Sequence, residues 1–437
     1  MRRRLTIATA IAALAVLVPA GAAQAASYTT KPGGGACGGS DRTCGSLAVA
    51  AKAMRPGDVL TISPGRYEES PRFDAPGLVV RGSKIAPGVV IEGTVTFAGA
   101  GGRASVLERL VVRASAAGAA AVLTTGTSGV SVRDASLFSV EGNALTLAAS
   151  AGSAVTRSRL LAGRAAIMLS GGPLTLDSSV LSGGTVAGGA GVAVPAPPRY
   201  TPMPATSIVG RHVTIAGAPT AIALLGPART TITDSIVLGA VHPSVSFTRT
   251  DRTSAAAALF VSPGTRNYRL RPGSPALDRG QITPGDSKTD VDGQPRTLGR
   301  ASDLGADELD TVAPRVTITR PRASQTLAAG GRVRLAGRAT DPSGVALVAF
   351  SLEVLPRAGR SCRWFHPVRA LVTRSCSRPV IVRAKLAKGG RWSYTGPRGL
   401  RLPGGRYRLT VSGNDRAGVS GNAASARQRT ITFRVRG

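Results

Sequence analysis

Residues 134–147, DASLFSVEGNALTL, and residues 157–169, RSRLLAGRAAIML, follow one pattern, and this pattern decides the fold. Each stretch opens on a charged residue, continues as a short apolar strand, turns at a glycine and ends in a second short strand. Further segments align on the same leading charge, with steps of 26, 23, 20, 34 and 23 residues. The leading residues are Glu108, Asp134, Arg157, Asp177, Arg211 and Asp234.

A repeat near 23 residues, with short alternating strands and no helical stretch, is typical of a parallel β-solenoid. Each turn of such a fold buries its inward side chains against the neighbouring turns. Leucine-rich repeats have a similar length but need a regular Leu/Asn pattern that is absent here. The 34-residue step contains Gly183–Ala205, which is rich in Gly and Pro and is expected to project as a loop.

The composition agrees with an all-β protein. The chain has 437 residues, 55 of them Gly and 29 Pro, and it is 43% hydrophobic. Tight turns and small packed residues are therefore favoured over long helices. Only three His and four Cys are present, which argues against a Cys/His zinc cluster.

The first 25 residues are expected to be a signal peptide. Arg2–Arg4 precede the apolar stretch Leu5–Val18, and Ala23-Gln24-Ala25 resembles a cleavage site. No later stretch is apolar for long enough to span a membrane, and no anchor signal is evident at the C-terminus. We expect a secreted protein, extracellular or associated with the cell surface.

Four cysteines fit an oxidising compartment. Cys37 and Cys44 bracket one short loop, and Cys362 and Cys376 bracket another. Short spacing predicts two local disulfides, Cys37–Cys44 and Cys362–Cys376, over free or catalytic thiols.

Positive charge is concentrated in the C-terminal part. Residues 311–437 hold 25 Lys and Arg against three acidic residues, whereas residues 26–310 hold 27 basic and 20 acidic residues. Such a surface attracts polyanions, with binding that weakens as salt rises. An Arg-rich composition throughout the genome would give the same excess without any partner.

The ends of the repeat region resemble a known family. Residues 46–68 contain "PGD" (Pro56–Asp58) and a "PGxY" turn (Pro64–Tyr67), similar to the opening of pectin-lyase-like proteins, which implies a right-handed parallel β-helix. Residues 267–280, NYRLRPGSPALDRG, with the later DVDGQPR and DLGADE, resemble the choice-of-anchor Q domain of bacterial secreted β-helices. The resemblance places the β-helix at residues 26–247 and its anchor-Q-type part at 248–310.

Residues 311–437 are similar to a bacterial Ig-like module, a β-sandwich. Alternating strands are expected near 313–319, 332–341, 345–352 and 405–415, separated by Pro and Gly turns. Trp364, Phe365 and Trp392 are its dense aromatics. These side chains either form the core of the sandwich or, if exposed, stack on a sugar.

The leading charges of the repeat are the candidate catalytic residues. Stacked at one corner, they would form a ladder that could cradle an extended sugar chain, and family lyases combine acidic calcium ligands with a basic proton acceptor. The residues of those types are Asp134, Arg157, Asp177, Arg211 and Asp234. The alternative is structural, because polar ladders are routine at tight turns and opposite charges on adjacent turns stabilise each other. Motifs of pectate lyases and polygalacturonases are absent, which puts both activities in doubt.

A second acidic cluster could hold Ca²⁺. Asp286, Asp290 and Asp292 have the hard oxygen ligands that Ca²⁺ prefers, but an EF-hand series is absent. Pairing of these residues with Arg296 or Arg300 is the competing interpretation. No other cofactor is indicated.

These expectations combine into one functional hypothesis. The protein would be a non-catalytic or catalytically degenerate β-helix that binds an acidic polysaccharide or an anionic cell-envelope polymer, with nucleic acid bound only non-specifically. The alternative is a polysaccharide lyase, pectate-lyase-like, or a glycoside hydrolase acting on an acidic polysaccharide. The sequence names neither the sugar nor the oligomeric state.

Overall fold

The structure is a computed structural model that describes residues 25–437 apart from 31–34, 38–41, 85–87, 102, 115, 126–128, 149–151, 185, 187, 198–203, 311, 329 and 416–428. Almost all of the proposed signal peptide lies outside the described residues. Among the described residues, no helix is long and apolar enough to cross a bilayer.

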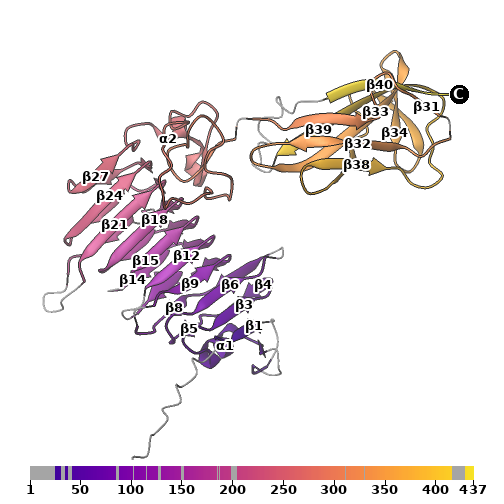
Figure 1. Cartoon of the computed structure of the whole chain (residues 1–437). Coiled ribbons are helices and arrows are strands. Elements are labelled where there is room, and N and C mark those ends of the chain that lie inside the picture. Colours follow the sequence, from indigo (N-terminus) through magenta and orange to yellow (C-terminus); the bar gives the residue numbers. More distant parts are fainter. Residues whose placement is uncertain are drawn as a thin grey trace, which may run out of the picture.

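The first half of the chain is a parallel β-solenoid with three sheets, and each full turn of the chain adds one strand to each sheet (Figure 1). The first sheet contains β1 (Ser27–Thr30), β2 (Thr43–Cys44), β3 (Val59–Ile62), β6 (Val79–Gly82), β9 (Ser105–Glu108), β12 (Val130–Arg133), β15 (Ser153–Thr156), β18 (Pro173–Asp177), β21 (Thr206–Arg211), β24 (Ala228–Thr233) and β27 (Val245–Thr248). The second contains β4 (Gly65–Tyr67), β7 (Val89–Glu92), β10 (Val111–Arg113), β13 (Ser136–Ser139), β16 (Arg159–Ala162), β19 (Val180–Ser182), β22 (Thr214–Ile215) and β25 (Ile236–Val237). The third contains β5 (Arg72–Phe73), β8 (Val95–Phe97), β11 (Val122–Thr124), β14 (Leu145–Leu147), β17 (Ile167–Leu169), β20 (Ala190–Val194), β23 (Thr220–Leu224) and β26 (Ala240–Val241).

Apolar side chains at equivalent positions stack inside the solenoid. Leu145 pairs with Ile167 and Leu147 with Leu169 on neighbouring turns, and all four side chains are fully buried. Because alternate residues of a strand point to opposite faces, the period-2 pattern of the sequence places this column inward. The expected solenoid is confirmed.

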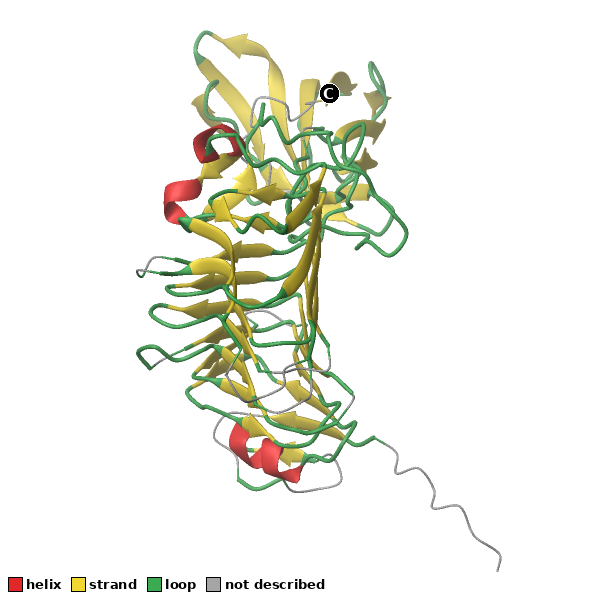
Figure 2. Cartoon of the chain, turned by 90° about the vertical axis from the view of Figure 1, so that its left-hand side faces the viewer, coloured by secondary structure: helices red, strands yellow, loops and turns green. Residues whose placement is uncertain are grey.

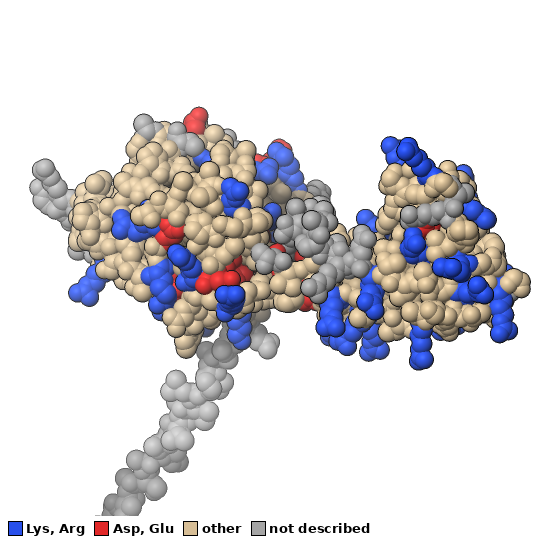
Figure 3. Space-filling model, turned by 90° about the horizontal axis from the view of Figure 1, so that it is seen from above, with Lys and Arg blue, Asp and Glu red and all other residues tan. Residues whose placement is uncertain are grey.

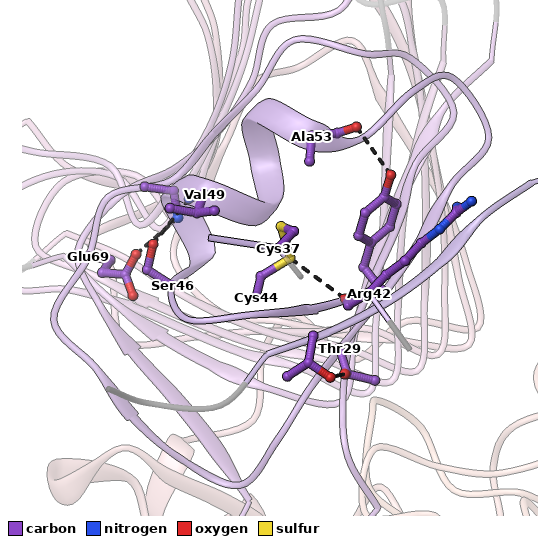
Figure 4. Close-up of a disulfide and its surroundings, with 11 residues drawn as sticks. Thr29, Cys37, Arg42, Cys44, Ser46, Val49, Ala53 and Glu69 are labelled. Carbon is purple, nitrogen blue, oxygen red and sulfur yellow. Dashed lines mark hydrogen bonds between the residues drawn. A yellow bond between two sulfur atoms is a disulfide. The ribbon is translucent and has the colours of Figure 1, made fainter. Parts of the chain in front are cut away.

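A short helix closes the N-terminal end of the stack (Figure 2). Helix α1 (Leu47–Ala53) begins at Ser46, whose side chain accepts a hydrogen bond from the N–H of Val49 at 3.1 Å. The Cys37–Cys44 disulfide lies beside this helix, and Cys44 is fully buried (Figure 4). The bridge and helix together cover the first turn, which has no preceding turn to pack against.

The expectation of a loop throughout Gly183–Ala205 is wrong for residues 190–194. These residues form β20, which pairs with β17 and β23 in the third sheet. Glycine and alanine here satisfy the backbone hydrogen bonds of the sheet, so a local Gly-rich composition does not prevent strand formation when both neighbouring turns supply partners.

Residues 249–310 pack against the outer face of the second sheet. Their regular elements are α2 (Ala256–Leu259), β28 (Phe260–Ser262), the 3₁₀ helix η1 (Pro263–Thr265) and β29 (Asn267–Leu270). Phe260 and Tyr268 join a core cluster with Val180 and Ile236 of the solenoid. Residues 249–310 are called the cap segment below. They bury the outer face of the last strands of the second sheet, while the inner face is buried in the solenoid core.

The C-terminal part is a β-sandwich with its own core, and two sheets build it. One is β30 (Arg315–Arg320), β32 (Arg334–Thr340), β38 (Arg391–Thr395) and β37 (Lys385–Leu386). The other is β31 (Thr326–Leu327), β40 (Arg429–Val435), β39 (Gly405–Asp415), β33 (Val345–Ala358), β34 (Ser361–His366) and β35 (Ala370–Ser375), with β36 (Val382–Arg383) beside β33. The expected strands are present, and Cys362–Cys376 is the second disulfide, so both predicted pairings are confirmed.

We predict that Leu147→Asp unfolds the turns around β14. An unpaired buried charge costs about 3–5 kcal/mol, a large part of a domain's stability. Thr146→Asp is the control, because Thr146 is on the same strand but only partly buried. Thermal unfolding followed by circular dichroism should show a large drop in Tm for Leu147→Asp only. Equal effects of the two variants would contradict the assigned register.

Candidate functional site

The six leading charges lie at one corner of the solenoid, but in two adjacent columns. Three end strands of the first sheet: Glu108, Asp177 and Arg211. Three follow such strands by one residue: Asp134, Arg157 and Asp234. Strand pairing therefore places Thr156 opposite Asp177, and Thr233 opposite Arg211. The expected single ladder is wrong by one residue at these turns, because alignment by charge cannot detect where each strand ends.

The second column is a backbone feature of the corner. Seven successive turns place a non-glycine residue there with φ between 43° and 57°, namely Arg109, Asp134, Arg157, Ser178, His212, Asp234 and Arg249. Left-handed backbone is uncommon outside glycine, and Asp and His tolerate it better than most residues. The repeated polar residue is thus explained by the turn, which supports the structural interpretation of the ladder.

Ion pairs along this column are bidentate. Arg157 donates to both carboxylate oxygens of Asp134 at 2.7 Å, and Arg249 donates to those of Asp234 at 2.7 and 2.9 Å. The guanidinium fork matches a carboxylate in this geometry, which fixes both side chains. These four groups bind each other across turns and do not present a vacant carboxylate to a substrate.

The cap segment covers the rest of the corner. Asp177 accepts the N–H of Ser287 at 2.7 Å, and Asp234 accepts that of Gln281 at 3.0 Å. Arg211 donates to Asp286 at 2.9 Å. Burial raises the pKa of the Asp177 carboxyl. The five catalytic candidates, Asp134, Arg157, Asp177, Arg211 and Asp234, therefore serve contacts within the solenoid or with the cap segment.

His212 lies beneath this contact. His212 lies in the corner turn, yet its side chain is fully buried, with Nε2 at 3.5 Å from Asp286. Burial, and then the charge of Arg296, lowers the pKa of His212 to about 4. The imidazole is neutral near pH 7, and solvent does not reach it.

The three metal candidates are separated by their partners. Asp286 binds Arg211, Asp292 binds Arg159 and Arg269, and Asp290 accepts backbone N–H groups of Asp292, Gln294 and Glu308. No group of close metal ligands among the described residues includes Asp286, Asp290 or Asp292. The three carboxylates are compensated by basic or backbone donors, as in the competing interpretation, but the basic partners of Asp286 and Asp292 are Arg211, Arg159 and Arg269.

Several acidic groups of the cap segment are buried around one arginine. Arg296 is 3% exposed and lies 3.9 Å from Glu308. Burial raises the pKa of Asp290 and Asp303 to about 6, that of Asp307 to about 7 and that of Glu308 to about 8. One buried cation does not compensate this many carboxyls, so protonation relieves the cost of their burial.

We predict that the folded protein loses stability as the pH rises from about 5 to 8. The carboxyl of Glu308, at about 8 against 4.5 in the unfolded chain, keeps its proton in the folded state over this window. The folded state then binds more protons than the unfolded state, and stability falls with rising pH. Calorimetric Tm measured across this range should fall more gently for Glu308→Gln than for wild type.

The exposed Glu68 provides the matched control. Glu68→Gln should leave the slope of Tm against pH unchanged. A slope that is the same for wild type and Glu308→Gln would contradict the assignment of a raised pKa to Glu308.

The aromatic sugar-binding candidates are core residues. Trp364 is 5% exposed, Trp392 is 1% exposed and Phe365 is fully buried. The indole N–H of Trp392 donates to the carbonyl of Thr317 at 3.1 Å. Stacking on a sugar needs an exposed ring face, so the core interpretation holds and the binding interpretation of Trp364, Phe365 and Trp392 is wrong.

The outer face of the four-stranded sheet is the surface that sequence reasoning missed. Its exposed cations, called the basic face below, are Arg315, Arg334, Arg338, Lys385 and Arg391. Exposed hydroxyls lie among them: Thr317, Thr340, Ser393 and Thr395. No ion pair among the described residues joins these cations to a carboxylate. Figure 3 shows Lys and Arg spread over the sandwich, with Asp and Glu sparse.

Strand pairing gathers these cations. Arg338 lies opposite Arg391 across β32 and β38, although like charges directly opposite are destabilising. Alternation of Arg with buried residues in β32 was visible in the sequence as Arg334, Leu335, Arg338 and Ala339. The pairing with β38 could not be read there, because the partner strand is distant in the chain.

Comparison with known proteins identifies the sandwich. The family model of the bacterial Ig domain matches residues 314–353, which run from the start of β30 into β33. No curated protein matches the chain. Among solved structures, murine CRIg is 16% identical, covering 28% of this chain and 96% of that chain, with a TM-score of 0.17. The first part of the C-terminal sandwich thus resembles a bacterial Ig domain, and the CRIg likeness carries no argument about function.

Proposed function

We propose that this protein is exported and binds an acidic polysaccharide or an anionic cell-envelope polymer without cleaving it. The observation that carries the proposal is the basic face, where cations and hydroxyls lie together. No ion pair among the described residues joins these cations to a carboxylate. Extended anionic sugars offer carboxylates for the guanidinium groups and hydroxyls for the Thr and Ser side chains.

The two disulfides support export, since such bonds persist in oxidising compartments. In this proposal the solenoid is a pectin-lyase-like β-helix, and residues 248–310 form its choice-of-anchor Q part. The solenoid would serve as a rigid body that carries the binding module. Nucleic acid would bind only through its phosphate charges, without sequence preference.

Replacing Arg315, Arg334, Arg338 and Arg391 together with Gln should weaken binding to polygalacturonate by at least about tenfold. Four surface ion pairs at about 0.5 kcal/mol each exceed the roughly 1.4 kcal/mol that a tenfold change requires. Affinity of the full chain should also fall steeply with salt. Calorimetry against polygalacturonate, with neutral dextran as the blank, measures both effects.

A matched control removes the same charge from the other sheet. Arg363, Arg374, Arg406 and Arg434 are also exposed, and their joint replacement with Gln should weaken binding clearly less. Equal losses in the two variants would show that the charge excess is a property of composition, and that the basic face is not a binding site.

The alternative function, a lyase or hydrolase, can be tested by looking for cleavage products. Because the candidate ladder is engaged by ion pairs and by the cap segment, we expect neither unsaturated products nor new reducing ends from uronate polymers, with or without Ca²⁺. Products that disappear in an Asp177→Asn variant would instead establish catalysis at this corner.

A further inference from the structure

Three aspartates from separate segments meet at one end of the Ig-like domain. Asp310 ends the cap segment, Asp341 directly follows β32, and Asp415 is the last residue of β39. One carboxylate oxygen from each lies within 4.8 Å of the other two. Segments far apart in the sequence thus bring three negative groups into contact, in a module that is otherwise strongly basic.

The Asp310 side chain carries an uncompensated oxygen. Its carboxylate is 1% exposed, Oδ1 accepts the N–H of Val312 at 2.8 Å, and Oδ2 is buried without a hydrogen-bond partner. Oδ2 of Asp341 is likewise buried and unpartnered. Within the described part of the chain, neither residue forms an ion pair with Lys or Arg. Buried carboxylates are normally paired or bound to a metal.

We propose that Asp310, Asp341 and Asp415 bind a divalent cation, with Ca²⁺ preferred. Oxygen ligands lie about 2.3–2.6 Å from Ca²⁺, so two ligands of one ion can be up to about 5 Å apart. The three carboxylate oxygens all lie within 4.8 Å of one another, which is compatible with one such coordination sphere. Ca²⁺ accepts flexible coordination by protein oxygens, whereas Mg²⁺ demands a near-ideal octahedron and usually keeps several waters, so a cluster of protein carboxylates favours Ca²⁺.

Solvent reaches Asp341 through a cleft. Gly344, Val345 and residues 386–390 of the β37–β38 hairpin line it, and so does Arg338 of the basic face. An ion could enter from this cleft on the Asp341 side. Once bound, it would tie the segment that leaves the solenoid to the ends of β32 and β39, so the ion would order the junction. This role needs no polyanion.

The first test is binding of the metal alone to the full chain. After treatment with a chelator and desalting, calorimetric titration with CaCl₂ should show one site per chain, and MgCl₂ should bind more weakly. Saturating Ca²⁺ should raise the Tm of the Ig-like domain by several degrees, since a ligand of the folded state alone stabilises it. Absence of Ca²⁺ binding at millimolar concentration would overturn the proposal.

Two variants separate a metal site from a structural cluster. Asp310→Asn and Asp341→Asn each keep the Oδ1 acceptor for Val312 or Ser343 but remove a negative charge. Without Ca²⁺, both should melt above the wild-type Tm because repulsion is reduced. With Ca²⁺, both should bind at least tenfold more weakly and lose the thermal shift.

Asp74→Asn is the matched control, because Asp74 is exposed and paired with Arg72. It should keep wild-type Ca²⁺ affinity and the full thermal shift. Unchanged Ca²⁺ binding in both Asp310→Asn and Asp341→Asn would overturn the assignment of these ligands. Since the basic face is intact in all these variants, failure of the metal site would leave polyanion binding unaffected.

Discussion

Backbone hydrogen bonding between parallel strands on successive turns is the interaction on which the solenoid depends. A single turn cannot satisfy its own N–H and C=O groups or bury its inward side chains, so each turn is stable only between two others. The first turn lacks such a neighbour, and α1 with the Cys37–Cys44 bridge takes its place. At the other end the chain folds back as the cap segment and covers the second sheet.

The same constraint explains the polar side chains at the corner. Seven successive turns pass through left-handed backbone at this corner, and polar residues such as Asp134 and Asp234 tolerate it there. Their charges are then compensated across turns by Arg157 and Arg249. Other polar groups of the corner bind the cap segment, in which several further carboxylates are buried around Arg296. Charged residue types that suggest catalysis thus serve ion pairs and hydrogen bonds that hold the turns and the cap segment together.

In the Ig-like domain, one face of each strand packs in the core and the other is exposed to solvent. Inward residues such as Trp392 and Tyr407 form the core, with ring stacking between Tyr407 and Phe433 at 5.5 Å. Outward residues of the four-stranded sheet contribute little to that core, so Arg338 and Arg391 can face each other at a modest cost. This sheet surface is therefore free of packing constraints, while Asp341 and Asp415 meet Asp310 at the junction with the solenoid.

The sequence by itself determined the repeat, its strands, both disulfides and the β-sandwich, because apolar periodicity and short cysteine spacing are local properties. Only the tertiary structure decided the register at the corner and the burial of His212. It also decided which charges are compensated: Asp286 and Arg211 are 75 residues apart, and Asp310 reaches Asp341 and Asp415 only in the folded chain. Electrostatic pairing depends on distances in space, and residue types along a chain do not record those distances.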